Sequence, residues 1–299
     1  MPVKQPISPG RRRFRQPLWP YLFALPMVLW LLAVFGYPMV KVVQYSFQVV
    51  GGKTVRWVGL ANYRFILRDP IFWKSLSNNA FLLLAVPILL ALSLLFAILL
   101  FERIRGWRFY RAVVFLPYVL APTAVGLAFG YMYQYNGVLN TLLRHLGVAG
   151  ADWLGKASLV MPSVMSVIIW QQLGFGVVLF LARLMSVPAE LYEAARIDGA
   201  NWWQEHRHIT IPQLRLAIEF FAVVEVITML SWVFNYVYVM TAGGPGFASH
   251  VLEYYIYKNA FAFRAMGVAS AVAVMLLAVT MVLVVFYFRL RNASQAAEE

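Results

Sequence analysis

Six residues in the second half of the chain have side chains that could bind a small polar molecule within largely apolar segments. Four of them can form hydrogen bonds through amide or carboxyl groups and two are aromatic, and together they are Gln171, Gln172, Glu225, Trp232, Asn235 and Tyr236. A polar group inside a membrane span costs free energy unless it meets water or a partner, so such residues are functional candidates. Asn235 and Tyr236 with Trp232 would suit a sugar, through hydrogen bonds and ring stacking. Hydrogen bonding between helices explains each residue alone equally well.

The sequence lacks the residues that ATP hydrolysis, enzymatic catalysis or metal binding would require. The sequence has no GxxxxGK[ST] loop, so we expect this chain not to hydrolyse ATP. No Ser/His/Asp set or carboxylate pair stands out, and no catalytic residue is predicted. With no cysteine and only four histidines, the chain is a poor candidate for a metal or iron–sulfur site. His206 and His208 would not share a helix face, and a solvated surface role is predicted for both.

The polar run from Leu191 to Pro212 separates two apolar segments and predicts a helix, a turn and a second helix. Its beginning combines acids, which favour a helix N-terminus, with alanines, which are strong helix formers; these residues are Glu190, Glu193, Ala194 and Ala195. Asp198 and Gly199 predict the end of that helix, because glycine accepts a positive φ there. Pro212 can begin or kink the next helix but does not fit comfortably inside one.

The spacing of this run resembles the EAA loop of bacterial ABC importer permeases. That loop reads EAA, three residues, Gly, nine residues, Ile, one residue and Leu-Pro, and the matching residues here are Glu193, Ala194, Ala195, Gly199, Ile209 and Pro212. Ile211 stands where the family usually has Leu. The resemblance covers most of the chain. The runs VGLANY at 58–63 and TAGGPG at 241–246 are similar to runs in sugar permeases of the maltose and glycerol-3-phosphate type.

The resemblance implies an all-α protein with the type I ABC importer permease fold, forming half of the translocation path for a sugar. Glu193 to Gly199 would be the centre of a coupling helix. Implied partners are a second homologous permease, two ATP-binding subunits on the cytoplasmic face and an extracellular or periplasmic solute-binding protein. ATP and Mg would be used by the ATPase partner, and no cofactor would be bound by this chain. A homodimer of permeases stays open.

The sugar itself is not identified by the sequence. Mono-, di- and oligosaccharides and glycerol-3-phosphate are all compatible with the resemblance. Neutral sugars are favoured, because no span contains an arginine cluster that would bind phosphate.

The composition is that of a polytopic membrane protein. The 299 residues are 62% hydrophobic and only 12% charged, and apolar runs of about 20 residues recur. The net charge of +13 could suggest nucleic acid, but an excess of Lys and Arg in cytoplasmic loops explains it better. We therefore expect a lipid bilayer, and no nucleic acid, as a partner.

Six membrane spans are predicted, at about 18–43, 77–101, 112–133, 158–183, 214–240 and 266–288. They form one permease domain over 18–288, with a cytoplasmic coupling loop at 184–213 and cytoplasmic tails at 1–17 and 289–299. The first apolar stretch is too long for a signal peptide and is interpreted as a retained span. Pro87 is expected to kink the second span. Gly126 and Gly130 lie on one face of the third span, where a neighbouring helix could approach closely, although plain packing explains them as well.

The basic residues indicate the orientation of the spans. With both termini and the coupling loop inside, 15 Lys and Arg residues are cytoplasmic and 10 are external, which accounts for all 25. The first outer loop is unusually basic. The reverse orientation would be worse, because it would export the arginine clusters at 11–15 and 103–111. The predicted location is a bacterial or archaeal cytoplasmic membrane.

Two other functions would leave different marks in the sequence. An ion-coupled secondary transporter predicts an internal repeat and a carboxylate pair in broken helices, and Glu225 alone does not meet that requirement. A membrane-embedded glycosyltransferase would need paired acids or a metal-binding motif at the membrane surface, and we find neither. Transport that persists without an ATPase would favour the first alternative.

Overall fold

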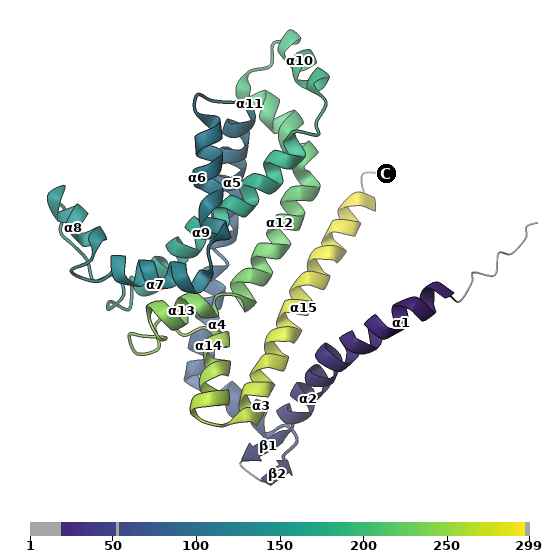
Figure 1. Cartoon of the computed structure of the whole chain (residues 1–299), viewed down its shortest axis with the longest axis vertical. Coiled ribbons are helices and arrows are strands. Elements are labelled where there is room, and N and C mark those ends of the chain that lie inside the picture. The colour runs from purple at the N-terminus through teal and green to yellow at the C-terminus, as the bar shows by residue number, and fades with distance from the viewer. Residues whose placement is uncertain (1–18, 52–53, 297–299) are drawn as a thin grey trace, which may run out of the picture.

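The computed structural model describes residues 19–51 and 54–296, and within these ranges the chain is helical apart from one short hairpin. Figure 1 shows long helices with α10 at one end of the molecule and the hairpin at the opposite end. In the described ranges, four segments are long and apolar enough to cross a membrane: Leu22–Ser46, Pro70–Phe101, Val160–Leu184 and Met266–Arg289. Two bent helix pairs bring the number to six, as predicted, when each pair counts as one span. The predicted tail at 1–17 and residues 297–299 lie outside the described residues.

The first span is a rod made of three consecutive pieces. They are α1 (Trp19–Leu31), the π-helical turn η1 (Leu32–Gly36) and α2 (Tyr37–Ser46). α2 packs against the last helix, α15 (Met266–Ala296), whereas α1 leans away from the other helices (Figure 1). The most apolar window of the rod buries none of its residues. Its hydrophobic side chains therefore face the surroundings of this subunit, which are lipid or another membrane protein.

A hairpin and a short helix close the end of the molecule opposite α10. The strands β1 (Gln48–Gly51) and β2 (Thr54–Trp57) pair antiparallel, and α3 (Ala61–Arg68) follows them. Asn62 Nδ2 donates to the carbonyl oxygens of Ser46 and Gln48, at 2.9 Å each, and so fastens α3 to the start of the hairpin.

The second span consists of α4 (Pro70–Leu82) and α5 (Ala85–Phe101). It begins earlier than predicted because Asp69 caps it: Ile71 N donates to Asp69 Oδ1 at 2.9 Å, and proline suits the first helical position. The helix is interrupted at Leu83–Leu84, three to four residues before Pro87, where a proline ring leaves no room for a regular helical carbonyl group.

The third span, predicted over 112–133, consists of two helices with a sharp bend between them. Its two parts, α6 (Trp107–Val119) and α7 (Pro122–Met132), meet at 101°. Leu120 and Ala121 between them are extended, since proline disfavours a helical residue before it. α7 packs against α13 (Phe234–Met240), and a Cβ on Gly126 would collide with the Val239 side chain. The predicted close approach at Gly126 is therefore confirmed.

The central helix, α9 (Val160–Leu184), agrees closely with the predicted fourth span. It packs against α5, α6 and α12 (Ile211–Ser231), and its buried side chains include Ile168 and Phe180. The fifth span also contains a break, at which α12 and α13 differ in direction by 43°. The Glu253 carboxyl group lies near the backbone N–H groups of Val233 and Phe234, which the break leaves without helical partners.

Short helices fill the remaining connections. α8 (Val138–His145) follows α7, while α14 (Leu252–Tyr257) and the π-helical turn η3 (Lys258–Ala262) lead into α15. Between α9 and α12 lie α10 (Ala189–Ile197), α11 (Trp202–Glu205) and the π-helical turn η2 (His206–Thr210).

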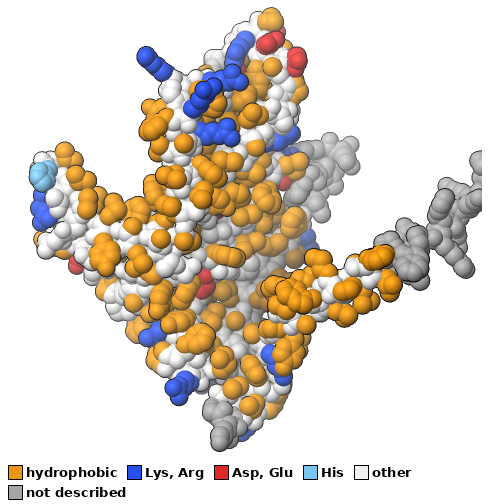
Figure 2. Space-filling view, in the orientation of Figure 1, with side chains coloured by type: hydrophobic (Ala, Val, Ile, Leu, Met, Phe, Trp, Pro, Cys, Tyr) orange, Lys and Arg blue, Asp and Glu red, His pale blue; other side chains and the backbone are white. Residues whose placement is uncertain are grey.

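Figure 2 shows hydrophobic side chains over the middle of the molecule, with Lys and Arg gathered mainly towards its two ends. This distribution fits a protein that crosses a bilayer.

Candidate functional site

The predicted coupling loop contains a short helix that stands at one end of the molecule (Figure 1). α10 follows Pro188, and Tyr192 is its only buried residue. Glu193 and Ala194 are exposed, and Ile197 is 86% exposed. The EAA residues thus belong to an outward, partly apolar face, which a partner protein could cover. Ala195, on the same helix, is half-buried.

The turn after α10 has the predicted geometry. Asp198 is the C-cap, and Gly199 has a φ of +81°. Ala200 N donates to Ala195 O at 2.9 Å, and Gly199 N donates to Arg196 O at 3.1 Å. A Cβ on Gly199 would meet no atom within 4 Å. The backbone conformation, and not a lack of space, therefore favours glycine here.

The second half of the loop leads directly into the fifth span. Asn201 and Gln204 form a capping box at α11, with N–H···O distances of 3.0 and 2.8 Å between backbone and side chain. Ile209 is half-buried in η2, and Pro212 lies in the first turn of α12. Because the helix is continuous from Trp202 through η2 into α12, Pro212 lies inside it, directly after the π-helical turn.

An ion pair joins the two halves of the loop across the turn. Arg196 Nε and Nη2 donate to Glu205 Oε2 and Oε1, both at 3.1 Å. This paired geometry is the strong form of an arginine–carboxylate contact. The Glu205 carboxylate, which is buried, raises the pKa of the Arg196 guanidinium above its ordinary value. Sequence reasoning missed Glu205, because a spacing of nine residues across a turn has no helical periodicity.

His206 is buried, so the solvated role predicted for it is wrong. Its Nε2 lies 3.1 Å from Glu102 Oε1, and its Nδ1 lies 2.8 Å from Thr210 Oγ1. Glu102 is the C-cap of α5 and far away in the sequence, so no local pattern could have indicated this contact. His208 is exposed, as predicted, with Nδ1 2.9 Å from Gln204 O.

Five of the six polar and aromatic candidates line one cleft of about 380 Å³ between α6, α7, α9, α12 and α13. They are Gln171, Gln172, Glu225, Trp232 and Tyr236. Asn235, which was predicted beside Trp232 and Tyr236, is not among the residues that line the cleft. The sequence analysis missed other lining residues, including Tyr118, Phe175 and Thr228, because aromatic and hydroxyl residues are common in buried helices.

Gln171 joins the two broken spans at this cleft. Its Nε2 donates to the carbonyl oxygen of Leu120, in the α6–α7 break, at 2.7 Å. Its Oε1 accepts from the Tyr236 hydroxyl, on α13, also at 2.7 Å. Helix-to-helix hydrogen bonding, the alternative to substrate binding, therefore accounts for Gln171 and Tyr236.

No hydrogen bond between helices explains the acidic residue Glu225. Its side chain is 0% exposed to solvent, it lines the cleft, and neither carboxylate oxygen has a hydrogen-bond partner among the described residues. A buried polar group without a partner is costly, so a site that retains one is a candidate for ligand contact. Trp232, unlike Glu225, is 71% exposed. Two other aromatic residues of the cleft, Tyr118 and Phe175, stack on each other with ring centroids 5.3 Å apart.

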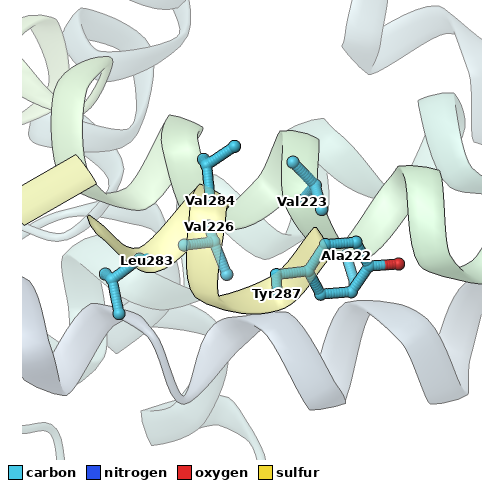
Figure 3. Close-up of a pocket in the computed structure, with 6 residues that line it drawn as sticks. All are labelled: Ala222, Val223, Val226, Leu283, Val284 and Tyr287. Atoms are coloured by element: carbon cyan, nitrogen blue, oxygen red, sulfur yellow. The ribbon is translucent and has the colours of Figure 1, made fainter. Parts of the chain in front are cut away.

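A second pocket is smaller and chemically different. It has a volume of about 140 Å³ and lies between α12 and α15. Figure 3 shows its lining of aliphatic side chains with a single tyrosine: Ala222, Val223, Val226, Leu283, Val284 and Tyr287. It offers a sugar few hydrogen bonds. Within the described ranges, no three His, Asp or Glu side chains come together to hold a metal ion.

Residues 60–294 match the family of binding-protein-dependent transport system inner membrane components. The chain belongs to this family. The probable ABC transporter permease protein YurN of Bacillus subtilis strain 168 is 38% identical, over 88% of this chain and 92% of YurN. The diacetylchitobiose uptake system permease protein NgcF of Streptomyces coelicolor is also 38% identical, over 81% of this chain and 72% of NgcF.

The fold of this inner membrane component is that of ABC importer permeases. A chain in the crystal structure of a bacterial ABC transporter involved in the import of the acidic polysaccharide alginate superposes with a TM-score of 0.82 and 24% identity. The match covers 92% of this chain and 96% of that chain. The predicted all-α permease fold is confirmed, and the family assigns the chain to transport and not to catalysis.

Proposed function

We propose that this inner membrane component is the permease subunit of an ATP-driven ABC importer for a sugar, coupled to its ATPase through α10. The observation that carries the proposal is the outward face of α10, with Glu193 and Ala194 exposed on a helix that ends at Ile197, just before the turn at Gly199. Glu193 would make a polar or ionic contact with the ATPase, and the two alanines of the motif would permit close approach.

The complete importer would contain further subunits. Two ATP-binding subunits would lie on the cytoplasmic face and use ATP and Mg. A second homologous permease would complete the translocation path, and the exposed apolar surface of α1 and α2 gives it a place to pack. An extracellular or periplasmic solute-binding protein would deliver the sugar, in keeping with the family description. Both termini and α10 would be on the cytoplasmic side of a bacterial or archaeal cytoplasmic membrane.

The cleft between the broken spans would contact the sugar. Gln172 and Glu225 can accept hydrogen bonds from hydroxyl groups, and Trp232 presents a ring for stacking. No Lys or Arg is among the cleft residues, which favours a neutral sugar over glycerol-3-phosphate. The name of NgcF, which refers to diacetylchitobiose uptake, fits the same substrate class.

The position of α10 suggests how ATP would open the path. α10 connects α9 to the region that begins α12, and these helices supply opposite parts of the cleft lining, with Gln172 and Phe175 on α9 and Glu225 and Thr228 on α12. When the ATPases close on ATP, the coupling helices would move together. The attached spans would then tilt as rigid bodies between two states.

A pull-down tests this function directly. The intact chain, purified in mild detergent, should bring with it an ATP-hydrolysing subunit and a second permease. Glu193→Ala should lower sugar import per ATP hydrolysed, while the matched control Arg144→Ala, on the surface of α8, should not. A chain that purifies alone and moves solute in liposomes under an ion gradient would instead establish a secondary transporter.

A further inference from the structure

We propose that Glu102, Trp202 and His206 form a joint that transmits motion of the coupling helix α10 into the second span. We refer to these three residues as the α5 joint. They act as positioning residues, since none of them lines the cleft. The inference rests on the proposed function, because it concerns how an ATPase at α10 would move the cleft.

The α5 joint is built on one carboxylate oxygen. Glu102 Oε1, at the C-terminal end of α5, accepts from Trp202 Nε1 at 2.6 Å and lies 3.1 Å from His206 Nε2. The Trp202 and His206 rings also meet edge to face, with centroids 4.4 Å apart. The end of the second span is therefore fastened to both α11 and η2, although about a hundred residues separate them in the sequence.

Hydrogen bonds continue from the α5 joint into α10. His206 Nδ1 lies 2.8 Å from Thr210 Oγ1, and Thr210 Oγ1 lies 3.3 Å from the hydroxyl of Tyr192, on α10. Tyr192 and Thr210 each carry a hydroxyl group that can donate or accept, and the two ring nitrogens of His206 face Thr210 and Glu102, so one continuous path of polar contacts joins Glu102 to Tyr192.

Burial stiffens the part of this path that runs from His206 to Tyr192, whereas Glu102 and Trp202 are exposed. The His206 side chain is 5% exposed, and Tyr192 and Thr210 are buried as well. Buried polar groups that lose a partner are costly, so the chain resists partial opening. The Tyr192 ring also packs against Phe101, with centroids 5.9 Å apart, directly beside Glu102.

The second span can pass motion on to the cleft. α5 packs along α9, where Leu89 and Ala97 are buried in the same core as Phe180, and Ser93 Oγ donates to Leu173 O at 3.4 Å. α9 carries Gln172 and Phe175 of the cleft. α10 is joined to α9 and α12 by covalent connections and touches α5 through the Tyr192 and Phe101 rings. The joint adds a polar connection that moves α5 with α10.

The test is made on the complete importer, purified with its ATPase and second permease and reconstituted with its binding protein. Glu102→Ala and His206→Phe should lower sugar import per ATP hydrolysed by about tenfold, the order expected when hydrogen bonds to a charged group are lost. Glu102→Gln keeps an acceptor oxygen and should restore most of the ratio. Arg105→Ala, an exposed neighbour in the same turn, should leave it unchanged.

A double variant tests whether the two residues act together. Because both single variants break the same connection, Glu102→Ala with His206→Phe should lower the ratio no further than either alone. An unchanged ratio in the single variants would overturn the inference. A parallel loss of ATPase co-purification would also overturn it, since the residues would then serve assembly only. Failure of the wild-type chain to bind any ATPase would instead refute the proposed function.

The motion itself can be followed with spin labels, because the native chain contains no cysteine. Labels at Glu190→Cys and Arg105→Cys report the distance between α10 and the end of the second span. We expect this distance to stay constant between the ATP-free and ATP-bound states, and to become broader or state-dependent with His206→Phe. A distance that changes with ATP in the otherwise unaltered importer would show that α5 and α10 do not move together.

Discussion

Gly199 provides a test that separates backbone conformation from side-chain size. Its φ of +81° is unfavourable for most residues, yet an added Cβ would have no atom within 4 Å. We therefore expect Gly199→Ala to impair coupling although alanine is small. Gly199→Asn should be better tolerated although asparagine is larger, because asparagine adopts left-handed backbone conformations more readily.

The magnitude follows from two opposing effects. A left-handed conformation costs an ordinary residue about 1–2 kcal/mol. Replacing glycine also restricts the unfolded chain, which offsets roughly 0.4–1 kcal/mol of that cost. The net penalty for Gly199→Ala is about 1 kcal/mol, which changes the population of the native turn by roughly fivefold. Gly199→Val should cost more, because a β-branched side chain fits this conformation worse.

The assay is sugar import per ATP hydrolysed in the reconstituted importer, together with the unfolding temperature of the purified complex. We expect both quantities to decrease in the order glycine, asparagine, alanine, valine. If asparagine impairs coupling as much as valine while alanine does not, then space against a partner subunit, and not φ, limits this position. That result would refute the reasoning from the turn.

Three further predictions concern the cleft and the end of the molecule opposite α10. Gln171→Leu should destabilise the subunit in detergent by about 1–3 kcal/mol, because two buried hydrogen bonds are lost, whereas the neighbouring control Gln172→Leu should change its stability less. Trp232→Ala should reduce sugar uptake without loss of ATPase co-purification, and unchanged uptake and selectivity would remove Trp232 from the substrate path. Burial raises the pKa of Glu253 to about 8, so its contribution to stability is present below its unfolded pKa and is lost as pH rises through 8. Burial lowers the pKa of His250 to about 4, which affects stability only below about pH 6.5. The unfolding temperature should therefore fall between pH 6.5 and 8, and a slope that persists in Glu253→Gln would contradict this assignment.

Local signals in the sequence predicted the coupling loop well. The acid at Glu190 and the left-handed Gly199 each depend on residues within one or two turns, and the structure has both. His206 was misjudged because its burial depends on Glu102, which no local pattern connects to it. A contact between distant segments is decided by tertiary packing, which periodicity does not report.

The breaks in the third and fifth spans were missed for a related reason. Average hydropathy over a window counts apolar residues and is insensitive to a local change of backbone direction. Pro122 was a visible signal for the break after Val119, because the residue before proline avoids the helical conformation. The fifth span has no proline at its break, and the Glu253 carboxyl group that supports it comes from α14.

The breaks in the third and fifth spans also explain which cleft residues have a structural role. Irregular backbone at membrane depth is tolerated only where its polar groups are buried in protein or line a cavity. Gln171 bonds the freed carbonyl of Leu120 and accepts from Tyr236, so both side chains hold the broken spans together. Among the described residues, the structure gives no comparable reason for Gln172, Glu225 and Trp232, which line the same cleft.

Substitutions in these two groups should therefore have different consequences. Changes at Gln172, Glu225 or Trp232 should alter which sugar is imported while the complex remains assembled. Changes at Gln171 or Tyr236 should lower stability for every substrate alike, because they weaken the connection between α6–α7 and α13. Competition between sugars in the uptake assay distinguishes the two cases. A selectivity change produced by Gln171→Leu with unaltered stability would show that the amide contacts the substrate and is not primarily a bridge between helices.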